Sequence, residues 1–148
     1  MMVLQNVRQD VARFLLVALG AVIIAALMSG CARMIPLHNV VDSKFPTIVS
    51  RKLSLDEIAD AMSVAGAGRA DTWVFFREKE QEMVAELNIR QHYAKVRIPF
   101  SKESFSIYYA SSEKLLYNGD LIHRNYNKWV KLLEQDIIEA CTAAAAKK

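Results

Sequence analysis

Apolar and polar residues alternate along three consecutive stretches in the middle of the chain. The apolar positions are Met83, Ala85, Leu87 and Ile89, then Ala94, Val96, Ile98 and Phe100, then Phe105, Ile107 and Tyr109. A period of two puts every second side chain on the same side of a sheet, and the connections between the stretches are short and polar. The pattern therefore predicts an antiparallel meander with one buried and one wet face. Pro99 has no backbone N–H to donate, so we expect it at a strand end or a bulge.

Shorter runs flank this meander. The run Trp73–Phe76 is rich in aromatic and β-branched residues and predicts extended structure ahead of the meander. A further short strand is expected at Leu115–Tyr117, before an Asn118-Gly119 turn, and Thr47–Val49 is expected to form a short edge strand.

Two segments have the period of helices instead. Ser54 and Glu57 form the S-x-x-E pattern of a capping box, with Leu53 placed to pack on Ile58, and Gly66 ends the predicted helix. A longer helix is expected from about Leu121. Its apolar stripe consists of Ile122, Tyr126, Trp129, Val130, Leu133, Ile137 and Cys141, and its polar face of Arg124, Lys128, Lys131, Gln135 and Glu139.

These elements predict an α+β fold. A short N-terminal helix precedes a three- or four-stranded antiparallel meander, and the long C-terminal helix packs on one face of the sheet, because the alternating strands offer only one apolar face. The length of 148 residues fits one such domain, which we place at residues 47–148. Two prolines and several turn-forming residues between positions 31 and 46 predict a tether rather than a folded element.

The first thirty residues have a different composition. Arg8 and Arg13 precede an unbroken apolar and glycine stretch, 14–28, which is followed by Ser29 and Gly30. A basic start, an apolar core and small residues before a cleavage site are typical of a secretory signal peptide. The chain is therefore expected to leave the cytoplasm or to remain held in a membrane.

The run Met28-Ser29-Gly30-Cys31 resembles the lipobox of bacterial lipoproteins, although Met28 stands where leucine is usual. The resemblance implies that Cys31 carries a diacylglycerol and that signal peptidase II cuts between Gly30 and Cys31, which removes residues 1–30. By analogy with lipoprotein sorting, Ala32 after the cysteine favours the outer membrane, facing the periplasm. The alternatives are a plain signal peptide and an uncleaved single-pass anchor.

The net charge argues against nucleic acid as a binding partner, and the cysteine content limits the possible disulfides. The net charge is only +3, with both signs interspersed, so the chain does not have the basic surface of a nucleic-acid-binding protein. Besides Cys31 the only cysteine is Cys141. If Cys31 carries a lipid, no intramolecular disulfide is possible, and Cys141 is expected to be a small core residue rather than a reactive thiol.

Two further stretches resemble a family of small uncharacterised bacterial lipoproteins. The segment from Ile89 to Ile98 matches an I-R-x-H-x-A-x-V-x-I strand, and the segment from Ile122 to Val130 matches an I-H-x-N-Y-N-x-W-V helix start. The likeness covers about Ser54 to Ile138, and it departs from the family at Thr72, where a glycine often precedes the tryptophan. It implies a fold and an envelope location but no activity.

No catalytic motif stands out. The chain has no G-x-S-x-G, no phosphate-binding loop and no H-E-x-x-H, so no enzyme activity, metal or cofactor is predicted. His92 and His123 can still meet, one at a strand start and one near a helix start, so a small enzyme or metal-binding protein is the rival interpretation. The preferred one is a binding or structural module for an envelope protein or ligand. Its candidate binding patch consists of Arg90, His92, Arg97, His123, Arg124 and Asn127.

Overall fold

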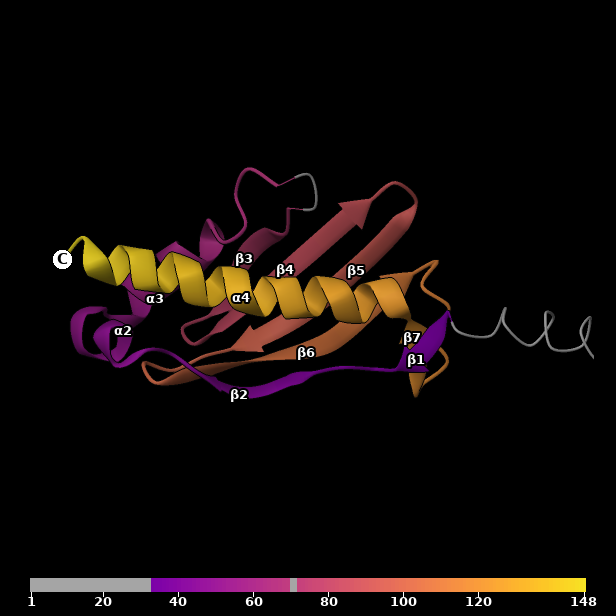
Figure 1. The fold of residues 1–148 in the computed structure, drawn as a ribbon, viewed down its shortest axis with the longest axis horizontal. Helices are drawn as coiled ribbons and strands as arrows, with labels where there is room; N and C mark the ends of the chain where they lie inside the picture. Colours follow the sequence, from indigo (N-terminus) through magenta and orange to yellow (C-terminus); the bar gives the residue numbers. More distant parts are fainter. Residues whose placement is uncertain (1–32, 70–71) are drawn as a thin grey trace, which may run out of the picture. The chain divides into compact units, whose positions relative to one another are not determined.

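The computed structural model describes residues 33–69 and 72–148, and the compact unit that they form is Met34–Lys148. The proposed lipobox with Gly30 and Cys31 lies outside these residues. The fold is α+β, as the sequence predicts. One long helix lies across one face of a sheet, and two short helices lie beside its C-terminal half (Figure 1).

The main sheet has five antiparallel strands in the order β2-β6-β5-β4-β3. In chain order these are β2 (Val40–Lys44), β3 (Val74–Lys79), β4 (Glu82–Ile89), β5 (His92–Pro99) and β6 (Ser104–Glu113). The predicted meander is confirmed as β4, β5 and β6, and Pro99 is the last residue of its strand. The alternation also gives the predicted faces, since Ala85, Val96 and Ile107 are fully buried under the long helix.

The expectation of a tether over residues 31–46 is wrong for its described part. Residues 34–36 form β1 (Met34–Pro36), which pairs with β7 (Leu121–His123) in a small second sheet, and residues 40–44 form β2 at the edge of the main sheet. The reason is burial, because Val40 and Phe45 are 5% and 7% exposed and belong to the core. The Asn39 side chain also accepts a hydrogen bond from the backbone N–H of Tyr109, which fixes this segment beside β6.

Two predicted short strands are also wrong. Residues 115–117 are not a strand, although the turn that follows is present, with Gly119 at a φ of 109°. Residues 47–49 begin the helix α2 (Thr47–Lys52) instead of an edge strand. Pro46, whose φ of −55° suits a helix start, directs the chain into α2, and only Val49 of that helix is buried.

The helix α3 (Leu55–Ser63) begins as the sequence predicts. The Ser54 side chain accepts from the Glu57 N–H, and the Glu57 carboxylate accepts from the Ser54 N–H, which completes the capping box. Hydrogen bonds from the Lys148 ammonium and from this Ser54 N–H lower the pKa of Glu57 to about 2. Lys148 thereby joins the end of the C-terminal helix to the start of α3.

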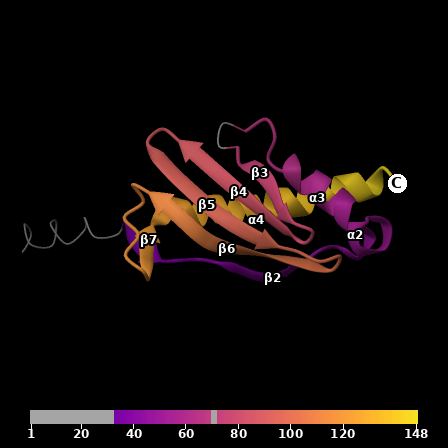
Figure 2. The same ribbon diagram turned by 180° about the vertical axis from the view of Figure 1, so that it is seen from behind.

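The long helix α4 (Arg124–Ala146) begins three residues later than expected, because residues 121–123 pair with β1 as β7. The predicted apolar stripe is buried and the predicted polar face is exposed. Figure 2 shows the sheet from the other side, where no helix of the described part covers it. The core therefore lies between α4 and one face of the sheet.

Tyr126 puts a hydroxyl into this core without a hydrogen-bond partner among the described residues. Its ring is fully buried and meets the Tyr109 ring edge-on, with the centroids 5.6 Å apart. Removing a hydroxyl that makes no hydrogen bond also removes its desolvation cost. We therefore expect Tyr126→Phe to leave the free energy of unfolding unchanged or to raise it by up to about 1 kcal/mol.

Urea unfolding of Tyr126→Phe and Tyr109→Phe checks this expectation. The Tyr109 hydroxyl lies 3.0 Å from the Ser112 hydroxyl, so its removal should destabilise the domain by about 0.5–1.5 kcal/mol. A larger loss for Tyr126→Phe than for Tyr109→Phe would contradict the burial of an unbonded hydroxyl.

Candidate functional site

The structure brings His92 and His123 together, at the corner where β5, β7 and α4 meet. The two rings are nearly parallel, with an interplanar angle of 22° and centroids 6.1 Å apart. Trp129, from the second turn of α4, lies against the pair, with its ring centroid 6.2 Å from that of His92. The strand start and the helix start therefore place the two histidines side by side, as the sequence allows.

Hydrogen bonds determine which ring nitrogens are available. Nδ1 of His92 lies 2.9 Å from the Lys114 carbonyl oxygen, so it carries the proton and donates. Nδ1 of His123 accepts from the backbone N–H of Asn125 at 3.3 Å and caps α4, so in the neutral ring the proton is on Nε2.

This arrangement favours a structural role over metal binding. A metal on Nε2 of His123 would move the ring proton to Nδ1 and break the cap of α4. Within residues 33–69 and 72–148, no three His, Cys, Asp or Glu side chains are grouped closely enough to hold a metal ion. The stacked rings of His92 and His123 therefore fix the start of α4 against the sheet.

Asn127 of the candidate patch also has a structural place. It is 7% exposed, its side-chain amide donates to the Pro36 carbonyl oxygen at 2.7 Å, and its Oδ1 accepts from the His38 N–H at 3.0 Å. These contacts join α4 to the last residue of β1 and to the connection between β1 and β2. The second asparagine of the N-Y-N motif thus holds the N-terminal strands, which the sequence alone did not indicate.

The three arginines of the patch do not converge. Arg90 occupies the turn between β4 and β5 with a φ of 55°, and Arg124 lies on the outer side of α4. Arg97 lies on the sheet face away from α4, where its guanidinium is 3.7 Å from the Glu82 carboxylate. The six predicted residues therefore divide between the histidine corner, a turn, the outer side of α4 and the opposite sheet face.

A shallow groove of about 320 Å³ runs along the outer side of α4 near β1. Its lining includes Ile35 of β1 and the cations Arg124, Lys128 and Lys131 of α4. These cations fall at i, i+4 and i+7, the spacing that aligns side chains on one side of a helix. Of the predicted patch, Arg124 and Asn127 line this groove.

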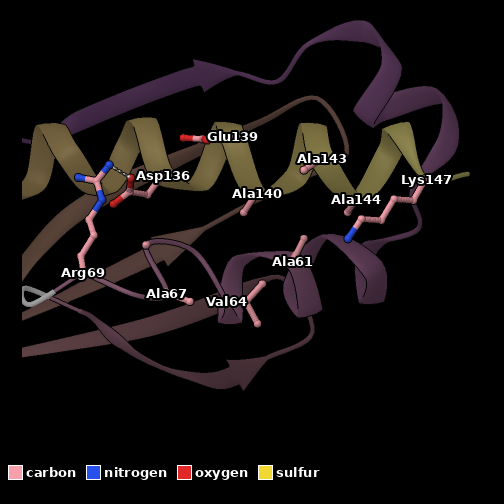
Figure 3. A pocket seen from close by; sticks show the side chains of 11 residues that line it. Ala61, Val64, Ala67, Arg69, Asp136, Glu139, Ala140, Ala143, Ala144 and Lys147 are labelled. Atoms are coloured by element: carbon pink, nitrogen blue, oxygen red, sulfur yellow. Dashed lines mark ion pairs between the residues drawn. The ribbon is translucent and has the colours of Figure 1, made fainter.

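A second hollow, of about 390 Å³, lies between α3, the following loop and the C-terminal half of α4. Asp136 is 8% exposed there, and its carboxylate is 2.9 Å from the Arg69 guanidinium (Figure 3). Burial raises the pKa of Asp136, and Arg69 only partly opposes this. A Cβ on Gly66 would lie 2.8 Å from that carboxylate, so the ion pair and the glycine together fix the loop on α4.

Asp136 was not among the predicted site residues. Its signal in the sequence is its position, because it falls next to Ile137 and seven residues after Trp129, at the margin of the apolar stripe. An acidic residue at such a position needs a cation, and only the structure identifies that cation as Arg69. Small side chains line most of this hollow, and we assign the ion pair a structural role.

Cys141 is buried at the end of the apolar stripe, as predicted. It is fully inaccessible, its thiol lies 4.0 Å from the Ile58 carbonyl oxygen, and burial raises the pKa of the thiol to about 12. Because thiol reagents attack the thiolate, we expect Cys141 not to react in the folded protein at pH 8 and to react fully in guanidinium.

A chromogenic disulfide reagent measures this accessibility. In guanidinium, the protein should show one reactive thiol if Cys31 carries a lipid and two if it does not. Rapid labelling of Cys141 without denaturant would contradict its burial.

Neither a protein-family model, nor a curated protein, nor a solved structure matches this chain. The resemblance to small lipoproteins stays a prediction. Among the helices of the described part, none combines the length and apolarity that crossing a membrane requires.

Proposed function

We propose that this protein is a bacterial envelope lipoprotein, anchored through Cys31, whose domain acts as a binding or structural module. One observation carries the proposal: the compact unit begins at Met34, three residues after Cys31. A cut between Gly30 and Cys31 would therefore remove no part of the sheet or of its helices. The proposed cleavage site therefore precedes the first residue of the folded domain by three residues.

The burial of Cys141 supports the same proposal. The two cysteines of the chain are Cys31 and Cys141, and the second is enclosed in the core. A disulfide between them would require the core to open, so the Cys31 thiol remains for a thioether-linked lipid. One acyl chain binds a bilayer only marginally, whereas the two or three chains of a lipoprotein hold it stably.

The structure gives more support to a binding or structural module than to an enzyme. The histidine corner uses one nitrogen of each ring for backbone contacts, and the ion pair of Asp136 fixes a loop. The sheet face away from α4 carries further paired charges, including Lys95 and Glu86 at 3.0 Å. That open face is the surface we assign to an envelope partner.

Intact-mass analysis of the protein purified from bacterial membranes tests the anchor. We expect a chain that begins at Cys31 and carries the mass of a diacylglycerol and an N-acyl group. Separation of the two membranes on a sucrose gradient should place it with the outer membrane. A mature chain without lipid, or one that begins after Cys31, would overturn the proposal.

A further inference from the structure

The end of the domain formed by β1 and β7 exposes a cluster of apolar side chains. Leu116, Tyr117 and Leu121 are 61%, 39% and 36% exposed, and all three lie within one short connection and the start of β7. Single exposed apolar residues are ordinary, but three within six residues of the chain make this turn a candidate contact surface, with the Tyr117 ring supported by that of Tyr109 at a centroid distance of 4.3 Å.

The connection that carries these residues is a well-bonded turn. Its backbone is closed by hydrogen bonds from the His123 N–H to the Leu115 carbonyl at 2.9 Å and from the Asn118 N–H to the Leu121 carbonyl at 3.2 Å. Leu116 has a φ of 57°, a left-handed conformation that costs a non-glycine residue about 1–2 kcal/mol. The fold thus holds Leu116 outward in a strained backbone.

Cations begin where the apolar cluster ends. Arg124 follows Leu121 by three residues, and Lys128 and Lys131 continue along the groove beside Ile35. None of these three cations has an ion-pair partner among residues 33–69 and 72–148.

Three acidic residues and one further cation lie nearby. Glu113 ends β6 and Lys114 follows it, and Asp120 is in the exposed turn. Glu134 is the nearest acid on α4, where it accepts a hydrogen bond from the Ser43 hydroxyl at 2.7 Å. The cations still outnumber the acids at this end of the domain. The surface is therefore basic next to an apolar tip.

The position of this surface in the chain indicates its partner. Ile35 lines the basic groove, and the Leu121 of the apolar cluster pairs with Pro36. Ile35 is four residues after Cys31, which is at most about 14 Å of extended chain. A lipid on Cys31 would therefore keep this end of the domain within reach of the bilayer surface.

We propose that the β1–β7 end docks on an anionic lipid bilayer, with Leu116, Tyr117 and Leu121 in the interface and Arg124, Lys128 and Lys131 at the headgroup phosphates. The inference rests on the proposed anchor and adds an orientation to it. Lys131 lies roughly 10 Å along α4 from Arg124, about one Debye length, so it contributes least. Docking would leave the open face of the main sheet to a partner in the periplasm.

A single fluorophore tests the docking in the full protein purified from its membrane. Because Cys31 is blocked and Cys141 is buried, Leu116→Cys provides one reactive thiol for a polarity-sensitive dye such as NBD. Phe76→Cys is the matched control, since Phe76 is 51% exposed but lies on β3, at the far edge of the main sheet. Both proteins are reconstituted into vesicles of phosphatidylcholine with or without phosphatidylglycerol.

We expect the dye at position 116 to shift to the blue in vesicles with phosphatidylglycerol, and the dye at position 76 not to shift. Arg124→Gln and Lys128→Gln should each lower the ratio of docked to undocked domain roughly fivefold, and Lys131→Gln should lower it less. Lys102→Gln in the β5–β6 turn should leave this ratio unchanged. Equal emission at position 116 in both vesicle types, or equal shifts at both positions, would overturn the docking. So would a shift caused by soluble polyphosphate without vesicles.

Flotation of the same samples at high salt distinguishes a failure of docking from a failure of the lipid anchor. Protein that floats with the vesicles at high salt, but whose dye at position 116 reports an aqueous environment in the low-salt emission measurement, has an anchor and does not dock. Protein that does not float, and whose mass shows an unmodified Cys31, contradicts the proposed lipid anchor itself.

Discussion

Trp129→Ala should destabilise the domain by about 3–5 kcal/mol, the largest loss that we expect from a single core substitution. Trp129 is 8% exposed and packs from α4 against His92, at the corner that joins the helix to the sheet. Alanine would remove the apolar area of the indole and leave a cavity that the fixed start of α4 cannot close. For a domain with an ordinary free energy of unfolding of about 5–15 kcal/mol, this is a large fraction of the total.

Urea unfolding followed by circular dichroism measures the loss. Gln135→Ala, on the exposed side of the same helix, is the matched control and should change stability by less than about 0.5 kcal/mol. A loss below about 1 kcal/mol for Trp129→Ala, together with lost binding to an envelope partner, would instead make Trp129 part of an interaction surface.

The elements in which apolar residues recur at a regular spacing were predictable from sequence. This regular spacing extends over many residues in the strands β4, β5 and β6 and in the stripe of α4, because each of these elements is buried on one side. The capping box of α3 is equally local, since Ser54 and Glu57 bond to each other. Interactions within a few residues leave a signal that the sequence alone reveals.

The short N-terminal strands were not predictable in this way. β1 has three residues and β2 has a bulge between Val40 and Ser43, so neither repeats a pattern long enough to recognise. Their stability comes from residues far along the chain, through Asn127 and the N–H of Tyr109. β7 is similar, because Leu121–His123 looks like the first turn of the helix until its pairing with β1 is known.

Some features of the candidate site were likewise predictable from the sequence, and others required the structure. The meeting of His92 and His123 followed from a strand start and a helix start, and the alternation along β5 predicted Arg97 on the wet sheet face. The cations at Arg124, Lys128 and Lys131 were predicted to be exposed. Their position next to β1, and hence near Cys31 along the chain, required the pairing of β1 with β7.

Cys31→Ser tests the central claim most directly, because the location of the protein and the orientation of its domain both depend on that thiol. Serine cannot take the thioether-linked diacylglycerol, and signal peptidase II is expected to cut only the lipid-modified precursor. We therefore expect wild-type cells to incorporate labelled palmitate into a protein that begins at Cys31.

Measured by palmitate labelling and by migration on a gel, the Cys31→Ser protein should contain no label and should remain an uncleaved precursor, held in the inner membrane by residues 14–28. Cys141→Ser should label and mature like the wild type, because Cys141 is enclosed in the core. If the wild type takes up no palmitate and Cys31→Ser is processed normally, the lipid anchor is wrong.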